Sequence, residues 1–165
     1  MAPQLLATVI TVSDEVAAAT DSERGAPVAE ELLTRLGVGV ERAVVPDDED
    51  ALEAAIRAAI TAGSRFVMTC GGTGIGPKDR SPETVRRLLS FEIPGIAEEI
   101  RRIGIAHAKP ALVSREVAGV ITPDHGAPVF VLAAPGSRGG VRDAIEVVGP
   151  ILTYIIEQLD GAGHV

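Results

Sequence analysis

Glycines gather between residues 71 and 76, in the run Gly71-Gly72-Thr73-Gly74-Ile75-Gly76. Glycine has no Cβ, so such a turn can aim successive backbone N–H groups at one anion, and a helix that begins behind it adds positive potential. An apolar run precedes the glycines, and Pro82 suits the first turn of a following helix. The spacing predicts a phosphate-binding turn. A tight strand-to-helix turn without a ligand would use the same residues.

Two familiar nucleotide-binding motifs do not match this turn. Pro77 follows Gly76 where a Walker A loop has Lys, and the three glycines 72, 74 and 76 are spaced one residue too closely for the dinucleotide fingerprint. These mismatches make a nucleotide-binding enzyme of an unrelated family the least favoured interpretation of the turn.

Acidic residues lie beside the predicted turn. Asp79 falls between Lys78 and Arg80, where a carboxylate would repel an anion unless it held Mg²⁺ that bridges phosphate oxygens. Asp47 and Asp48 end a predicted strand at the same sheet edge, so one of them could meet Asp79 across the site. The structural alternatives are helix capping by any of the three, or an Asp79–Lys78 pair.

A second anion position is predicted farther along the chain. Ser114-Arg115 ends a short strand, and Pro135-Gly136-Ser137 opens the last long helix, whose N-terminus attracts negative charge. Ordinary strand ends and helix starts look the same. The remaining basic and imidazole side chains receive no role: the arginines 86, 87, 101 and 102 are assigned to helix surfaces, and the histidines 107, 125 and 164 share no metal-ligand spacing.

The elements that would position these residues alternate between strand and helix. Apolar runs predict strands over 5–12, 38–45, 65–70, 111–122 and 128–134, the last two antiparallel. Helical spacing predicts helices over 25–36, over the amphipathic run that contains Leu52 to Ile60 and ends at Gly63, and over 82–90. Two more are predicted, one from Pro94 onward and one over 138–159 with a break at Pro150. Residues 13–25 are predicted to form a polar loop. The pattern predicts an α/β fold with a mostly parallel sheet.

Composition narrows the class of protein. The 165 residues fit one domain, 1–165, and 46% hydrophobic with only 2% aromatic residues predicts a core of Val, Ile, Leu and Ala. A net charge of −8 disfavours nucleic acid as a partner. A single cysteine, Cys70, excludes an internal disulfide, and no apolar stretch reaches membrane-spanning length, so we expect a cytoplasmic protein.

Taken together, these segments resemble the molybdopterin adenylyltransferase family, the Mog/MoaB-type proteins of molybdenum cofactor biosynthesis. The resemblance covers nearly the whole chain in order, and its most specific block is residues 69–83. The matching segments read TVSD at 11–14, VPDD at 45–48, TCGGTGIGPKDRSPE at 69–83, IPG at 93–95, VSR at 113–115 and APGS at 134–137.

The resemblance implies a three-layer α/β/α sandwich with a mixed, mostly parallel central sheet, the molybdopterin-binding-like fold, usually as a homotrimer. It implies Mg²⁺-dependent adenylyl transfer from ATP to the terminal phosphate of molybdopterin, with release of pyrophosphate, and a molybdenum-insertion protein as a further partner. By position it assigns catalysis and Mg²⁺ binding to Asp47 and Asp79. It assigns substrate binding to the remaining matched positions: Gly71, Gly72, Thr73, Gly74, Ser114, Arg115, Pro135, Gly136 and Ser137.

Three positions depart from the family pattern. Lys78 stands where Arg is common, Arg80-Ser81 replaces the frequent Val-Thr, and Ala133-Ala134 replaces the usual Asn-Leu before Pro-Gly. The missing Asn side chain motivates a second hypothesis: a molybdopterin-binding or assembly protein of the same fold that lacks adenylyltransferase activity.

Overall fold

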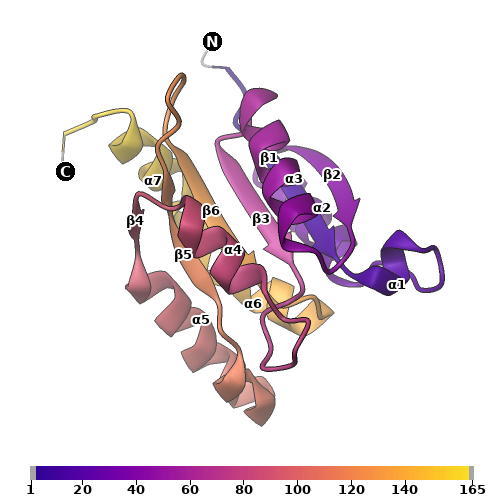
Figure 1. Ribbon diagram of the computed structural model, residues 1–165. Coiled ribbons are helices and arrows are strands. Elements are labelled where there is room, and N and C mark those ends of the chain that lie inside the picture. The colour runs from indigo at the N-terminus through magenta and orange to yellow at the C-terminus, as the bar shows by residue number, and fades with distance from the viewer. Residues whose placement is uncertain (1–2, 164–165) are drawn as a thin grey trace.

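The computed structural model describes residues 3–163, and all six of its strands join one sheet in the order β2-β1-β3-β6-β5-β4 (Figure 1). The predicted α/β class is confirmed. The strands run over β1 Leu6–Val12, β2 Gly39–Val45, β3 Phe66–Cys70, β4 Phe91–Glu92, β5 Val117–Ile121 and β6 Val129–Ala134.

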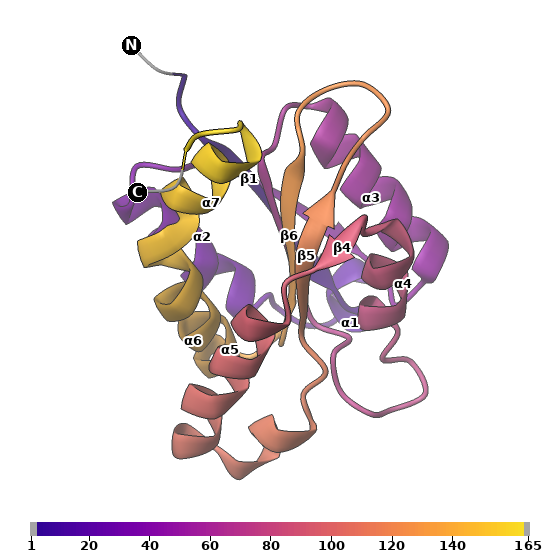
Figure 2. The same ribbon diagram turned by 90° about the vertical axis from the view of Figure 1, so that its left-hand side faces the viewer.

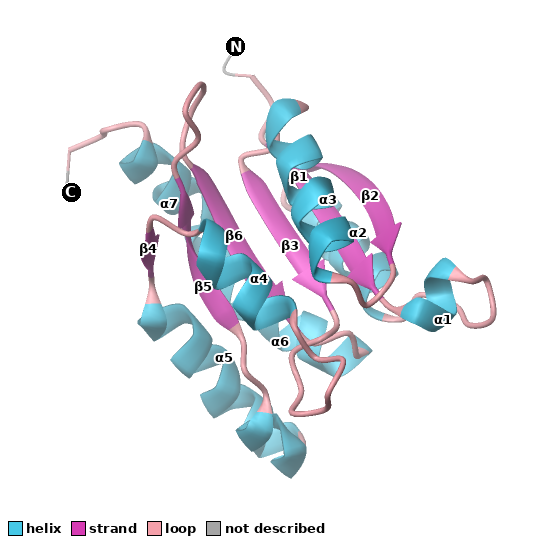
Figure 3. Ribbon diagram, in the orientation of Figure 1, coloured by secondary structure: helices cyan, strands magenta, loops and turns pink. Residues whose placement is uncertain are grey.

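Strand direction sets which loops meet. β1, β2, β3 and β6 are mutually parallel, whereas β5 is antiparallel to β6 and β4 is antiparallel to β5 (Figure 3). Val12 pairs with Val45 and Cys70 pairs with Ala134, so the four parallel strands end in register. The loops that follow them therefore leave one edge of the sheet, the edge at which ligands bind in open α/β sheets.

Helices cover both faces of the sheet, which gives the predicted three layers (Figure 2). The helix bounds are α1 Asp14–Ala17, α2 Gly25–Arg35, α3 Glu49–Thr61, α4 Ser81–Leu88, α5 Pro94–His107, α6 Arg138–Val148 and α7 Leu152–Leu159, with 3₁₀ turns at Lys109–Val113 and Gly149–Ile151. Helices α2, α5, α6 and α7 pack on one face, and α3 and α4 pack on the other.

Alternate residues of the central strands feed these two cores, as the period of a β-strand requires. Phe66 and Phe130, on adjacent strands, stack with ring centroids 5.2 Å apart beneath the four-helix layer. Val67 and Val131 face α3 and α4. Because both faces are covered, β3 and β6 are buried along their whole length, which explains their nearly continuous apolar sequence.

Two predictions about secondary structure were wrong in part, and one short strand was missed. The polar loop 13–25 contains the one-turn helix α1, whose N-cap Ser13 accepts a hydrogen bond from Val16 N at 3.2 Å. The predicted strand 111–122 is a 3₁₀ turn followed by β5 alone, because Pro110 has no N–H for a strand ladder and favours a turn. The two-residue strand β4 was not predicted. The break at Pro150 is confirmed, since a 3₁₀ turn separates α6 from α7.

No helix within residues 3–163 is both long enough and apolar enough to cross a membrane.

Candidate functional site

Two cavities open side by side at the carboxyl edge of the sheet. The α5–α6 cavity, about 460 Å³, lies between the glycine turn and helices α5 and α6. The β1–α2 cavity, about 520 Å³, lies between the end of β1 and the segment that enters α2. Gly136 and Ser137 line both cavities, and the glycine turn gives Gly71 to one and Gly72 to the other. The two spaces therefore meet at the start of α6.

The first two residues of the glycine turn have backbone angles that favour glycine. Gly71 has φ +114° and Gly72 has φ +71°, and a Cβ on Gly71 would lie 2.5 Å from the carbonyl oxygen of Val12. Ser81 Oγ donates to Gly71 O at 2.8 Å, so Ser81 ties the turn to the start of α4. Gly72, Thr73 and Gly74 all line the α5–α6 cavity, and their predicted role in substrate binding stays a prediction.

Asp79 lies inside the curve of the glycine turn. Its Oδ2 accepts a hydrogen bond from Gly76 N at 2.8 Å, and a Cβ on Gly74 would approach the same oxygen to 2.7 Å. The side chain lines the α5–α6 cavity, and it neither caps α4 nor pairs with Lys78. The glycines at 74 and 76 thus let the chain wrap around a carboxylate that faces the cavity.

Asp47 is held by a different partner. Asp14 N donates to Asp47 Oδ2 at 3.0 Å and Asp47 N donates to Asp14 Oδ1 at 2.8 Å, so the two aspartates tie the end of β1 to the end of β2. The Lys78 ammonium donates to Asp14 Oδ2 at 2.8 Å, and this hydrogen bond lowers the pKa of the Asp14 carboxyl. Asp48 is the residue that caps α3, through Ala51 N at 2.8 Å.

The two predicted catalytic aspartates do not line one cavity. Asp47 lies in a small pocket with Lys78 and Arg80, next to but apart from the α5–α6 cavity of Asp79. Within residues 3–163, no three His, Cys, Asp or Glu side chains are close enough to form a metal site by themselves.

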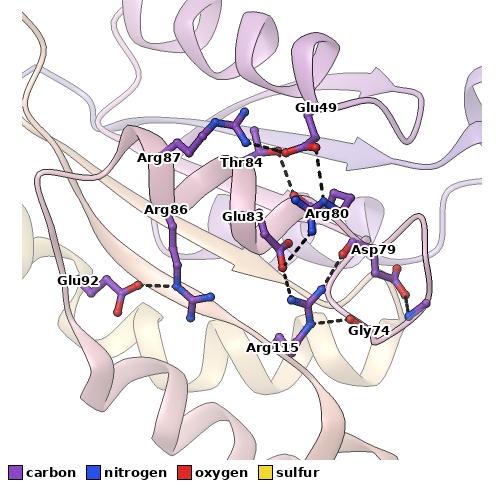
Figure 4. A network of polar contacts seen from close by, with 11 residues as sticks. Glu49, Gly74, Asp79, Arg80, Glu83, Thr84, Arg86, Arg87, Glu92 and Arg115 are labelled. Atoms are coloured by element: carbon purple, nitrogen blue, oxygen red, sulfur yellow. Dashed lines mark hydrogen bonds and ion pairs between the residues drawn. The ribbon is translucent and has the colours of Figure 1, made fainter.

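Arg115 braces the turn from below (Figure 4). Its guanidinium donates to Gly74 O at 2.8 Å and to Asp79 O at 2.6 Å, and it pairs with Glu83. Arg115 lines neither the α5–α6 cavity nor the β1–α2 cavity. Its predicted role in substrate binding stays a prediction. The same network continues through Arg80 and Glu49, which join α4 to α3.

Replacement of Arg115 by Lys is expected to loosen the turn. Lysine keeps the charge but cannot reach three acceptors with a planar fork, so we expect a loss of roughly 1–3 kcal/mol in the free energy of unfolding. Urea denaturation measures it, with Arg102→Lys as the control, because Arg102 is an exposed arginine of α5 that pairs with Glu99 in the same helix. Equal stability of both variants would contradict the bracing role.

The second predicted anion position is also at the cavity. Ser137 caps α6, accepting from Gly140 N at 3.1 Å, and Pro135, Gly136 and Ser137 line the α5–α6 cavity. Ser114 lines the same cavity, with its Oγ 3.4 Å from Thr73 Oγ1. Apart from Asp47, Arg115 and Gly71, the predicted site residues therefore all line one space, although they come from three separate segments of the chain.

Sequence reasoning missed three polar side chains of this cavity: His107, Glu116 and Asp143. Glu116 is 4% exposed and pairs with Arg101, which was assigned to the surface; burial raises the pKa of Glu116. Asp143 is 7% exposed and contacts His107. One of the three could have been found from the sequence, because Asp143 interrupts the apolar face of α6 that Val141, Ala144 and Ile145 form.

Cys70 lies at the floor of the β1–α2 cavity, where burial raises the pKa of its thiol to about 12. A thiol whose pKa exceeds its unfolded value of 9.0 favours the folded state below pH 9, and this contribution is lost as the pH rises from 9 toward 12.

We expect a thiol reagent at pH 8 to label Cys70 far more slowly in folded protein than in urea-unfolded protein. Equal labelling rates would contradict this burial.

Comparison with known proteins agrees with this geometry. Residues 8–154 match the family described as "Probable molybdopterin binding domain". The chain is 37% identical over 161 residues to the "Molybdenum cofactor biosynthesis bifunctional protein" of Synechococcus elongatus, covering 97% of this chain and 49% of that protein. It therefore spans about half the length of that relative.

A relative of similar length is the "Molybdopterin adenylyltransferase" of Pyrococcus furiosus, 32% identical over 153 residues, with 90% of this chain and 88% of that protein covered. Among solved structures, a molybdopterin biosynthesis protein from Mycobacterium abscessus superimposes with a TM-score of 0.86 at 36% identity, covering 96% of this chain and 98% of that one. The fold, the glycine turn and these matches together show that the chain belongs to the molybdopterin-binding domain family of molybdenum cofactor biosynthesis.

Proposed function

We propose that the chain is a molybdopterin adenylyltransferase that transfers the adenylyl group of ATP to the terminal phosphate of molybdopterin. The observation that carries this proposal is the pair of cavities that meet at Gly136 and Ser137, beside the glycine turn. Two anionic substrates could approach each other there over one set of backbone donors.

The lining of each cavity suggests its occupant. The α5–α6 cavity has apolar walls from Ile100, Ala111 and Val113, which suit the flat ring system of a pterin. The β1–α2 cavity is lined mainly by polar and charged side chains, including Arg24 and Arg138, which suit a nucleotide. The phosphates of both substrates would then lie near the α6 N-terminus.

In the proposed reaction, an oxygen of the molybdopterin phosphate forms a bond to the α-phosphorus of ATP, the bond from that phosphorus to the bridging oxygen breaks, and pyrophosphate leaves. The protein's task is alignment and charge stabilisation. Backbone N–H groups of the glycine turn and of α6 would hold the reacting phosphates, and Ser137 fixes the first turn of α6. Arg115 keeps the turn in shape from outside the cavity.

We propose Mg²⁺ as the cofactor. The carboxylates of Asp79 and Asp47 are the hard oxygen donors that Mg²⁺ prefers, and Mg²⁺ is commonly held by one or two carboxylates together with substrate phosphates and water. This chemistry fits an edge where residues 3–163 offer no complete ligand set. The ion would neutralise phosphate charge during transfer.

The alternative of a binding protein without transferase activity rests on Ala133-Ala134, and the structure gives it no support. Both alanines are fully buried in β6, and neither lines either large cavity. A side chain at position 133 would point into the core beneath α3 and α4 rather than toward a ligand.

The test is release of pyrophosphate from ATP by purified protein supplied with Mg²⁺ and molybdopterin. We expect release that depends on molybdopterin and stops on addition of a chelator. Tight binding of molybdopterin with no pyrophosphate release would overturn the transferase assignment and favour the binding protein.

We further propose a cytoplasmic homotrimer that hands its product to a molybdenum-insertion protein, as the family resemblance implies. Exposed apolar side chains such as Ile75, Phe91 and Leu112 are compatible with contacts between copies. Sedimentation equilibrium of the purified chain would test the trimer, and a monomer at micromolar concentration would contradict it.

A further inference from the structure

Three carboxylates line the α5–α6 cavity, and two of them are already engaged within the protein. Asp79 Oδ2 accepts a hydrogen bond from Gly76 N inside the glycine turn. Glu116 Oε2 lies 3.3 Å from Arg101 Nη1, so this carboxylate has a half-buried cationic partner. The third carboxylate, Asp143, is buried and contacts the His107 imidazole.

The Asp143 side chain is 9% exposed and has one engaged oxygen. Oδ1 lies 3.1 Å from His107 Nδ1, while Oδ2 has no hydrogen-bond donor among the residues that the structure describes. Oδ2 therefore has acceptor capacity that a ligand with an N–H donor can use. Asp143 lines the cavity, which means that such a donor can reach it.

A glycine on the opposite helix leaves the approach to Asp143 open. A Cβ on Gly104 would lie 3.5 Å from Asp143 Oδ2 and 3.1 Å from Ala111 Cβ, and would fill the space in front of the free oxygen. Asp143 is six residues beyond the N-cap Ser137, which places it roughly 9 Å along the helix axis from the anion-binding end. The cavity thus offers anion donors at one end and a hydrogen-bond acceptor at the other.

We propose that Asp143 is the specificity-determining residue that recognises the pyrimidine edge of the pterin, with His107 as its positioning residue. This inference rests on the proposed function. The 2-amino group and the adjacent ring N–H of a pterin form a pair of donors that matches the two oxygens of a carboxylate. His107 occupies only one lone pair of Oδ1, so both oxygens can still accept from the ligand.

The test compares two small ligands, 6-hydroxymethylpterin monophosphate and the matching lumazine, in which an oxo group replaces the 2-amino group. Calorimetry on wild-type protein should show the pterin binding at least about 100-fold more tightly, because the lumazine sets a carbonyl oxygen against the carboxylate. Asp143→Asn should weaken pterin binding roughly 10- to 100-fold. It should also erase most of the preference, since an amide can donate to the oxo group.

Glu146→Gln is the matched control, because Glu146 is an exposed acid on the same helix; its preference for the pterin should equal that of wild type. Equal affinity of wild type for the two ligands would overturn the inference without any variant, even if Asp143→Asn failed to fold. An unchanged preference in folded Asp143→Asn would also overturn it. Wild-type protein that bound neither compound would do the same, and the pyrophosphate assay decides separately whether the proposed function falls as well.

Discussion

Asp79→Asn is expected to lower the rate of molybdopterin-dependent pyrophosphate release by about 10²–10³-fold, the usual cost of removing one group that stabilises charge in a transfer reaction. Asp79 is the predicted catalytic residue that lies both in the glycine turn and on the cavity wall. The Asn side chain has nearly the same shape, and its oxygen can still accept from Gly76 N. The variant therefore removes the negative charge that would bind Mg²⁺ and leaves the shape of the turn in place.

Two measurements separate loss of chemistry from loss of structure. Circular dichroism and the thermal midpoint of Asp79→Asn should match wild type within a few degrees. Asp124→Asn serves as the control, since Asp124 is exposed in the turn between β5 and β6, at the sheet edge opposite the cavities. Full activity of Asp79→Asn, or an equal loss in Asp124→Asn, would remove the role proposed for Asp79.

Most of the sheet could be predicted from sequence because its buried strands carry a strong local signal. β1, β3 and β6 are covered on both faces, so nearly every residue in them is apolar. β4 has only two residues, both exposed, and so shows no periodicity. The predicted strand 111–122 joined two apolar runs that Ser114, Arg115 and Glu116 separate. These three residues contact the glycine turn or line the cavity, and such contacts leave no local pattern in the sequence.

The candidate site was predictable where glycine and aspartate stand close together in sequence, and it was not where partners come from distant segments. The glycine turn and Asp79 form one local unit, and Gly72, Thr73, Gly74 and Asp79 all line the α5–α6 cavity, while their role in ligand binding stays a prediction. The contact of Asp47 with Asp14 joins residues 33 positions apart, and His107 meets Asp143 across 36 positions. Such pairs depend on how the strands and helices pack, which single-sequence patterns do not specify.

Gly71→Ala is expected to cause the largest loss of stability in this region. With φ +114° the position is unfavourable for any residue with a Cβ, and the added methyl would lie 2.5 Å from the carbonyl oxygen of Val12, at the end of the neighbouring strand β1. Backbone oxygen cannot move aside as a flexible side chain can. We expect the free energy of unfolding to fall by roughly 3 kcal/mol or more, from strain and overlap together.

Gly63→Ala separates these two causes. Gly63 has φ +100°, close to that of Gly71, but a Cβ there would meet nothing within 4 Å, so its cost in urea denaturation should reflect backbone strain alone, on the order of 1–2 kcal/mol. The excess cost at Gly71 then measures how tightly the glycine turn is held against β1. If both variants lost the same stability, the turn would have room to yield, and it could not hold a fixed array of phosphate donors.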